Sequence, residues 1–152
     1  ALQVRYALPV EALPLAVEGG LVARSYDPFA LALKVGVVGR WERKALSVLF
    51  GLNLFAGLSE RDAGNKEVIN IPITAMYALN AKAAVGLQTG ISLPFEDAGD
   101  FYRVPVALGG RYMVTPKAHV DLIFTLPFLL SGIEPINGVD SRVLTLAGGY
   151  AF

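Results

Sequence analysis

The sequence contains no cysteine and a single histidine. The lack of cysteine excludes disulfide frameworks and thiolate metal sites, and one histidine cannot form a zinc site alone. Thirteen basic and thirteen acidic residues give a formal net charge of zero, which offers no electrostatic basis for binding nucleic acid. We therefore expect no metal, no other cofactor and no nucleic-acid partner.

The sequence is also short of charge and of long apolar runs. Charged residues make up 17% of the 152 residues, whereas soluble domains contain about 25%. Mean hydropathy is +0.51, yet no uninterrupted apolar run reaches the roughly 20 residues that a helical membrane span needs. Short segments can be this apolar in a closed sheet whose outer face meets lipid. No charged-then-apolar leader precedes Ala1, so an exported protein would already have lost its signal peptide in this numbering.

Alternation with a period of two runs through most of the chain. In segment 29–41, Leu33 and Val35 alternate with Ala32, Lys34 and Gly36. This pattern predicts strands with one large apolar face and one small or polar face. Counting back from the last residue gives strands near 140–152, 117–129, 101–114, 82–94, 67–79, 45–58 and 29–41, with an eighth from 13–26 or 2–10.

The predicted fold is an all-β, antiparallel, up-and-down transmembrane β-barrel of eight strands. Residues 1–152 form one domain of this kind, in which residues 1–12 are either a barrel strand or a periplasmic lead-in. Tight turns carrying Lys44, Lys82 and Lys117 alternate with longer polar loops. Short turns on one side and longer loops on the other are typical of outer-membrane barrels.

Four prolines fall inside predicted strands, where each removes a ladder hydrogen bond. They are Pro72, Pro94, Pro105 and Pro127, all on the half of the strand away from the tight turns. We expect bulges, or an end to continuous pairing, at these positions near the loop-side rim.

The last strand ends on aromatic residues. Counting back in twos from Phe152 gives Tyr150, Gly148, Leu146 and Leu144 on one face. The terminus Tyr150-Ala151-Phe152 resembles the closing strand of bacterial outer-membrane β-barrels, and the whole pattern resembles the eight-stranded OmpA/OmpX-type barrels. The resemblance implies a location in the bacterial outer membrane and contact of the last strand with the barrel-assembly machinery.

Outward aromatic residues near both ends of the strands support a membrane location. Phe29 with Trp41, and Tyr102 with Tyr112, lie ten to twelve residues apart. At ~3.3 Å per residue and a tilt of about 45°, this separation spans roughly 23 to 28 Å, close to the apolar band of such barrels. The predicted membrane-interface aromatics are Phe29, Trp41, Tyr77, Tyr102, Tyr112, Tyr150 and Phe152.

The inward face carries the polar and charged residues. These are Glu18, Arg24, Lys34, Arg40, Asn53, Asn70, Lys82, Gln88, Arg103, Arg111, His119 and Asp121. One hypothesis is a hydrogen-bonded filling, because an eight-stranded barrel has an interior just wide enough for side chains. The other is a narrow polar path or small-ligand cavity, favoured by small inward residues such as Gly86 and Gly109. Inward basic residues outnumber acidic ones, so an open path should prefer anions.

His119 and Asp121 share one strand face and could interact. A lipid-modifying enzyme would need a serine beside them, but Ser47, Ser92 and Ser141 cannot be placed near His119 from sequence. We interpret the two as a structural pair and expect no enzymatic activity.

The expected function is therefore that of a non-enzymatic outer-membrane β-barrel, acting as a membrane anchor or as a component of an envelope assembly. Its expected partners are outer-membrane lipid and other envelope proteins. The alternatives are a small pore or carrier for a minor solute or apolar molecule, a lipid-modifying enzyme, and a soluble β-barrel with a ligand cavity. An odd strand count or a half-barrel would indicate assembly between chains.

Overall fold

The computed structural model describes residues 1–10, 13–133, 138 and 141–151. Within them the chain forms one antiparallel sheet of nine strands, arranged in sequence order. The strands are β1 (Leu2–Leu8), β2 (Leu15–Tyr26), β3 (Phe29–Arg43), β4 (Leu46–Gly57), β5 (Val68–Ala78), β6 (Ala83–Pro94), β7 (Arg103–Thr115), β8 (Ala118–Ser131) and β9 (Val143–Tyr150). A helix of four residues, α1 (Ala98–Phe101), precedes β7. In this described part of the chain, no helix is long and apolar enough to span a bilayer.

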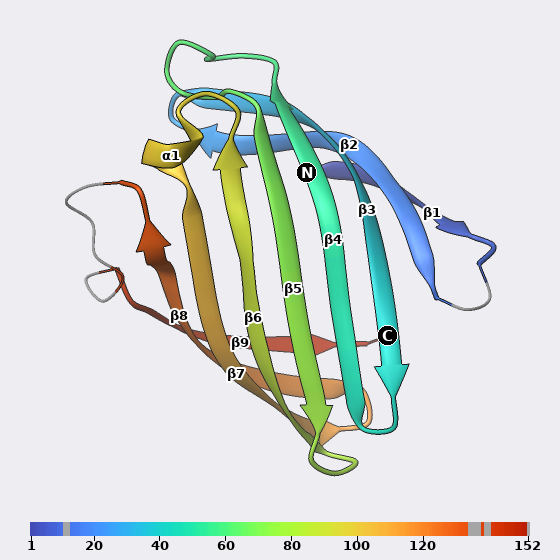
Figure 1. Cartoon of the computed structure of the whole chain (residues 1–152). Helices are drawn as coiled ribbons and strands as arrows, with labels where there is room; N and C mark the ends of the chain where they lie inside the picture. Colours follow the sequence, from blue (N-terminus) through green and yellow to red (C-terminus); the bar gives the residue numbers. More distant parts are fainter. Residues whose placement is uncertain (11–12, 134–137, 139–140, 152) are drawn as a thin grey trace.

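The sheet curls into an open trough, with β3 to β7 as its wall and β1 and β9 at its edges (Figure 1). In the described sheet, β1 pairs with β2 and β9 pairs with β8, and the two edge strands do not pair with each other. The predicted all-β, antiparallel, up-and-down architecture is confirmed. The described sheet is not closed.

The predicted count of eight strands is wrong. Both candidate segments near the amino end form strands, and β1 pairs with β2 from Leu2 opposite Leu21 to Leu8 opposite Leu15. Pro9 and Pro14 interrupt only the connection between them, because proline removes a backbone donor without preventing pairing on either side. Residues 2–8 are therefore a paired edge strand.

The prolines disturb the pairing as predicted. Pro105 lies at the register shift between Val104 and Val106, and Pro127 lies opposite, where the partners jump from Leu126 to Leu130. Pro94 is the last residue of β6. Pro72 pairs with Gly90 of β6, while the pairing of β5 with β4 lapses between Ile73 and Asn70. The β4–β5 and β7–β8 ladders are thus interrupted on the loop-side half of the sheet, whereas the β5–β6 ladder runs unbroken through Pro72 and Pro94.

The exposed fractions of the side chains follow the predicted alternation. In β8, Val120, Leu122 and Phe124 are exposed, whereas His119 and Asp121 are partly covered. In β3, Ala30 and Ala32 are buried while Phe29, Leu33 and Val35 are exposed. The large apolar residues therefore cover the convex face of the sheet, and the small and polar residues line its concave face.

Connections differ between the two ends of the trough. The β3–β4, β5–β6 and β7–β8 turns lie at one end, and the longer β4–β5, β6–β7 and β8–β9 connections lie at the other (Figure 1). We call these the turn end and the loop end. β3 runs two residues further than predicted, to Arg43, and Lys44 turns the chain with a φ of 55°.

Candidate functional site

The concave face carries a carboxylate held by two cations. Glu18 of β2 accepts hydrogen bonds from Arg5 of β1 (2.7 Å to the Arg5 guanidinium) and from the Lys34 ammonium of β3. The Glu18 side chain is only 3% exposed and that of Lys34 14%. A buried carboxylate requires such partners, because removing it from water is costly. This cluster joins the first three strands of the sheet.

A second ion pair crosses from β7 to β8. Arg111 donates to both carboxylate oxygens of Asp121, at 2.7 and 2.8 Å, from directly opposite positions in the ladder. His119 Nε2 lies 3.7 Å from Asp121, beyond hydrogen-bonding distance. Among the described residues no hydrogen bond connects His119 to a serine. Both carboxylate oxygens of Asp121 are thus held by Arg111.

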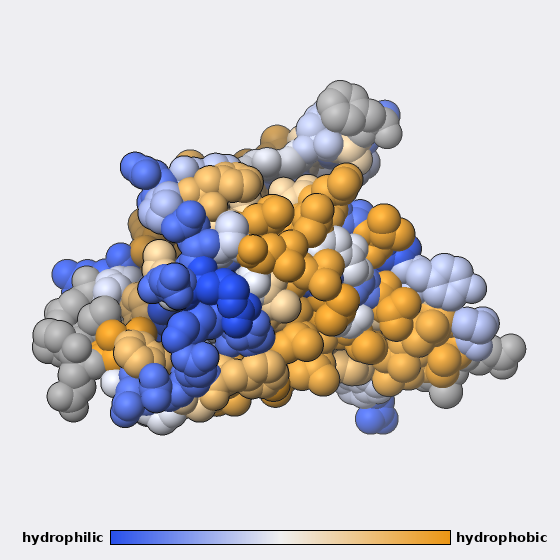
Figure 2. Space-filling model, turned by 90° about the horizontal axis from the view of Figure 1, so that it is seen from above, coloured by the Kyte–Doolittle hydropathy of each residue, from blue (hydrophilic) through white to orange (hydrophobic). Residues whose placement is uncertain are grey.

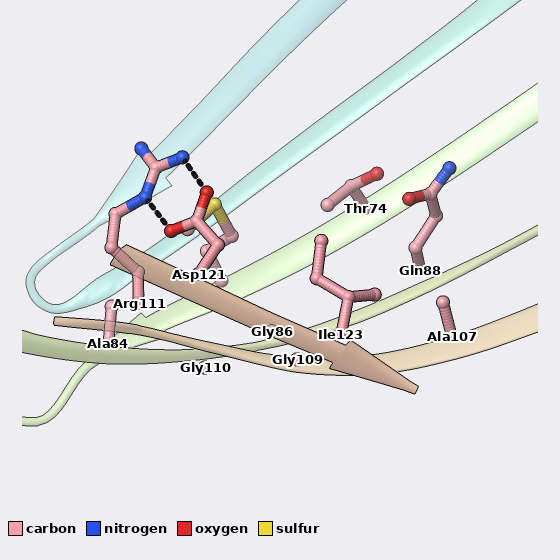
Figure 3. Close-up of a pocket in the computed structure, with 11 residues that line it drawn as sticks. Thr74, Ala84, Gly86, Gln88, Ala107, Gly109, Gly110, Arg111, Asp121 and Ile123 are labelled. Atoms are coloured by element: carbon pink, nitrogen blue, oxygen red, sulfur yellow. Dashed lines mark hydrogen bonds and ion pairs between the residues drawn. The ribbon is translucent and has the colours of Figure 1, made fainter. Parts of the chain in front are cut away.

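A cavity of about 150 Å³ opens beside this pair (Figure 3). Gln88, Thr74, Ile123 and the Arg111–Asp121 pair line it, together with the glycines of β6 and β7. A Cβ atom at Gly86 would lie 3.4 Å from its nearest neighbour, so this position is small but not crowded. The small inward residues therefore leave open volume on the concave face, toward the turn end of β5, β6 and β8.

Two asparagines meet in the middle of the sheet. Asn53 of β4 is 6% exposed and lies opposite Asn70 of β5. Within the described structure, its Oδ1 is buried without a hydrogen-bond partner. A Cβ atom at Gly36 would lie 2.3 Å from that oxygen, so the amide occupies the space left by the absent side chain.

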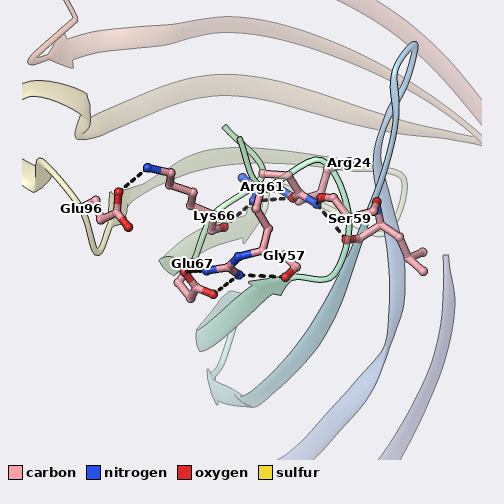
Figure 4. A network of polar contacts seen from close by, with 9 residues as sticks. Arg24, Gly57, Ser59, Arg61, Lys66, Glu67 and Glu96 are labelled. Carbon is pink, nitrogen blue, oxygen red and sulfur yellow. Dashed lines mark hydrogen bonds and ion pairs between the residues drawn. The ribbon is translucent and has the colours of Figure 1, made fainter. Parts of the chain in front are cut away.

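The loop end is organised by the β4–β5 loop, residues 58–67 (Figure 4). The buried Asn65 donates to the carbonyl oxygens of Leu31 and Ser59, at 2.8 and 2.6 Å. Arg24 donates to the Asn65 side chain at 3.1 Å and to the Lys66 carbonyl at 2.9 Å. These bonds fold the loop against β2 and β3.

Two exposed ion pairs complete the loop network. Arg61 pairs with Glu67, which lowers the pKa of that carboxyl and raises the pKa of the guanidinium. Lys66 pairs with Glu96 across to the β6–β7 connection, which raises the pKa of the Lys66 ammonium. The loop is thus tied to its own base and to the neighbouring β6–β7 connection.

Residues of this network line a cavity of about 570 Å³. Its charged lining comprises Arg24 of β2, Arg103 of β7, the Lys66–Glu96 pair and two loop aspartates. In the described structure neither Arg24 nor Arg103 forms an ion pair with a carboxylate. Arg103 lies over the Phe128 ring, 5.3 Å from its centroid.

The structure places most of the predicted inward residues on the concave face, although not in one site. Arg40 pairs with Glu42 near the turn end, and Gln88 lines the 150 Å³ cavity. Lys82 is exposed in the β5–β6 turn, outside the strand face predicted for it, because β6 begins at Ala83. Neither Asn65 nor the Arg61–Glu67 pair could be predicted from the sequence, since a polar loop has no period that identifies its contacts.

Aromatic residues mark both ends of the strands. Trp41, Tyr77, Tyr112 and Tyr150 lie near the turn end and are exposed. Phe29 begins β3 at the loop end and is also exposed, and Tyr102 directly precedes β7. The prediction for Phe152 lies outside the described residues. Seen from above, the surface has broad hydrophobic areas beside a large hydrophilic cluster, with smaller hydrophilic areas near its margins (Figure 2).

No protein-family model, curated protein or solved structure matches this chain. Among the described residues, no group of three or more histidine, cysteine, aspartate or glutamate side chains could hold a metal ion.

Proposed function

We propose that this protein is a non-enzymatic β-barrel protein of the bacterial outer membrane, acting as a component of an envelope assembly. The observation that carries the proposal is the distribution of side chains across the sheet. Leu52 and Leu122 on the convex face are 54% and 53% exposed, while Glu18 and Lys34 on the concave face are largely covered. In water this arrangement would expose the apolar face to solvent. In a bilayer the same face would contact hydrocarbon, which is favourable.

The aromatic residues at the strand ends support the same location. Trp41, Tyr112 and Tyr150 lie near the turn end, and Phe29 lies at the loop end. Aromatic side chains at the turn end and at the loop end are suited to the two interfaces of a bilayer. The apolar centres of the strands would then lie between the two interfaces. Outer-membrane lipid is the corresponding partner.

The open edges favour assembly over an isolated anchor. β1 and β9 run in the same direction, because an antiparallel meander reverses at each of its steps. Direct closure would pair them in parallel, whereas one further strand, or any odd number, would complete an antiparallel barrel. Unpaired backbone groups cannot remain in hydrocarbon. An envelope partner that supplies an odd number of strands would close the barrel with antiparallel pairing. It would also pair the backbone groups of both edge strands.

Membrane residence is tested by extraction and by gel migration. The folded protein should require detergent for solubility, and its electrophoretic mobility should change on heating as the sheet unfolds. Trp41, which is 40% exposed, should be quenched by brominated lipids in vesicles. A monodisperse protein in detergent-free buffer, with Trp41 unaffected by brominated lipid, would instead favour a soluble β-barrel with a ligand cavity.

Assembly is tested with a photo-crosslinking residue introduced at Val4 of β1 or at Leu146 of β9 in the bacterial envelope. Both side chains are highly exposed and lie on the edge strands. We expect protein adducts from these two positions and lipid adducts alone from Leu52, in the middle of the wall. Crosslinks that join only β1 to β9 within one molecule would show direct closure and contradict the assembly proposal.

A small pore is the second candidate function, and the cavities on the concave face favour it. Cavities of about 150, 420 and 570 Å³ lie along that face. A pore predicts ohmic openings in planar bilayers that phenylalanine at Gly86 or Gly109 abolishes, since both line the 150 Å³ cavity. Bilayers that contain the folded protein and show no conductance would exclude this alternative.

A further inference from the structure

We propose that the 570 Å³ cavity at the loop end binds an amphiphilic anion: a phosphate or carboxylate group joined to a short apolar chain. The site is lined by residues of β2, β5, β6 and β7, of α1, and of the β4–β5 and β6–β7 connections. It goes beyond the proposed envelope role, because it assigns a ligand class to a particular set of residues.

Two arginines supply the anion-binding groups. Arg24 and Arg103 reach the same cavity from opposite walls of the trough. Arg24 uses one of its terminal nitrogens to hold Asn65 and the Lys66 carbonyl, which leaves its other donors available. Guanidinium groups bind phosphate and carboxylate oxygens through paired hydrogen bonds.

Three cations and three carboxylates line the cavity, yet in the described structure neither Arg24 nor Arg103 forms an ion pair with any of these carboxylates. Lys66 and Glu96 neutralise each other. The loop aspartates of the lining, Asp62 and Asp97, help to raise the pKa values of Arg61 and Lys66 respectively, and in the described structure neither aspartate forms an ion pair with Arg24 or Arg103. The charged group that acts on Arg24 is Arg103, another cation. Two like charges that repel each other in one cavity are stabilised by an anion placed between them.

Both arginines stand at irregularities of the sheet. Arg24 is the extra residue at the register shift between Ala23 and Ser25. Arg103 begins β7 beside the shift at Pro105. Bulges commonly redirect a side chain next to a functional site. The local backbone thus presents both guanidinium groups at the rim of the trough, where a ligand arriving from outside can reach them.

The rest of the lining is suited to an apolar chain. Phe101, Val68, Pro94 and Ala63 contribute apolar surface, and the Ser92 hydroxyl adds one polar group. Phe101 is 50% exposed, so a bound chain would cover a large aromatic side chain that now faces water. An inorganic anion would use the arginines alone, whereas an amphiphilic anion would use both parts of the cavity.

The proposal is tested by titrating the whole chain, folded in a neutral maltoside detergent, with octyl phosphate, octanoate, inorganic phosphate and the neutral octanol. We expect octyl phosphate to bind at least about tenfold more tightly than octanol, because each guanidinium contact to a charged group is strong. Tighter binding of octyl phosphate than of octanoate would identify a phosphate ligand, and the reverse a carboxylate. Inorganic phosphate that binds as tightly as octyl phosphate would overturn the amphiphile assignment.

The matched variants are Arg103→Gln and Arg40→Gln. Arg103→Gln should weaken octyl phosphate binding by about tenfold. Arg40→Gln removes one positive charge from a different cavity near the turn end, and should leave binding unchanged. Equal loss in both variants, or no loss in either, would overturn the site. If Arg103→Gln fails to fold, the unaltered protein is titrated with added sodium chloride instead. The salt should weaken octyl phosphate binding without changing octanol binding. An affinity for octyl phosphate that does not depend on salt would overturn the proposed site.

Discussion

Arg111 and Asp121 occupy directly opposite positions on β7 and β8, and the guanidinium binds both carboxylate oxygens at 2.7 and 2.8 Å. The Asp121 side chain is 14% exposed and that of Arg111 is 42% exposed. Because Arg111 remains partly in solvent, we expect Arg111→Gln to reduce the free energy of unfolding by about 1 kcal/mol. Urea unfolding of the protein in lipid vesicles measures this change. An unchanged midpoint would show that the pair contributes nothing to stability.

Glu18 should be more sensitive than Asp121. Glu18→Gln leaves the covered Lys34 ammonium without its carboxylate and releases Arg5 of the edge strand. We expect a loss of about 2 kcal/mol, less than for a fully buried pair because Arg5 is exposed. The double variant Glu18→Gln with Lys34→Met should recover part of the loss in the same unfolding assay. A double variant less stable than the single one would contradict this account.

Gly36 leaves the space that the Asn53 amide occupies. A Cβ atom at Gly36 would lie 2.3 Å from Asn53 Oδ1 and 2.8 Å from the Leu52 carbonyl oxygen. Gly36→Ala should therefore destabilise the sheet by about 1 to 3 kcal/mol through overpacking. Gly110→Ala is the control, since its nearest neighbour would be 3.8 Å away. Equal stability of the two variants would refute the close approach.

The β4–β5 loop should open when the Arg61–Glu67 pair is lost. Arg61 lowers the pKa of Glu67, so the pair stabilises the loop above the ordinary glutamate pKa of about 4.3. That contribution disappears as pH falls through the lower pKa of the folded protein. Glu67→Gln should remove it at every pH and speed tryptic cleavage after Arg61 severalfold at neutral pH. Cleavage at the unaltered rate would contradict the prediction, and a Glu67 titration midpoint above 4.3 by NMR would do the same.

Much of the fold follows from one physical regularity. A strand places successive side chains on opposite faces, so the alternation through Leu33, Lys34 and Val35 predicts both the strand and the side that each residue faces. The same alternation continues into residues 2–8, and only the choice of an even strand number led to eight strands instead of nine. The prolines predicted interruptions because each lacks a backbone donor, and the pairing shows them.

The candidate site could be predicted only in part. The inward direction of Arg24 and Arg103 follows from strand periodicity, but their convergence on one cavity depends on the curl of the sheet. The bulge at Arg24 and the fold of the loop around Asn65 depend on contacts between residues distant in sequence. No local pattern encodes these contacts. Lys82 shows the same limit, since a shift of one residue at the strand start moves it from the face to the turn.

The central claim is that the convex face lies in hydrocarbon, and single-cysteine spin labelling tests it most directly, because the native chain has no cysteine. Labels at Leu52 and Leu122 of the convex face, and at Gln88 and Thr125 of the concave face, would be measured in lipid vesicles. The account predicts that the convex labels are relaxed more by oxygen, which concentrates in hydrocarbon, than by a water-soluble nickel complex. The concave labels should not show this preference. Convex labels relaxed mainly by nickel would place that face in water and contradict the account.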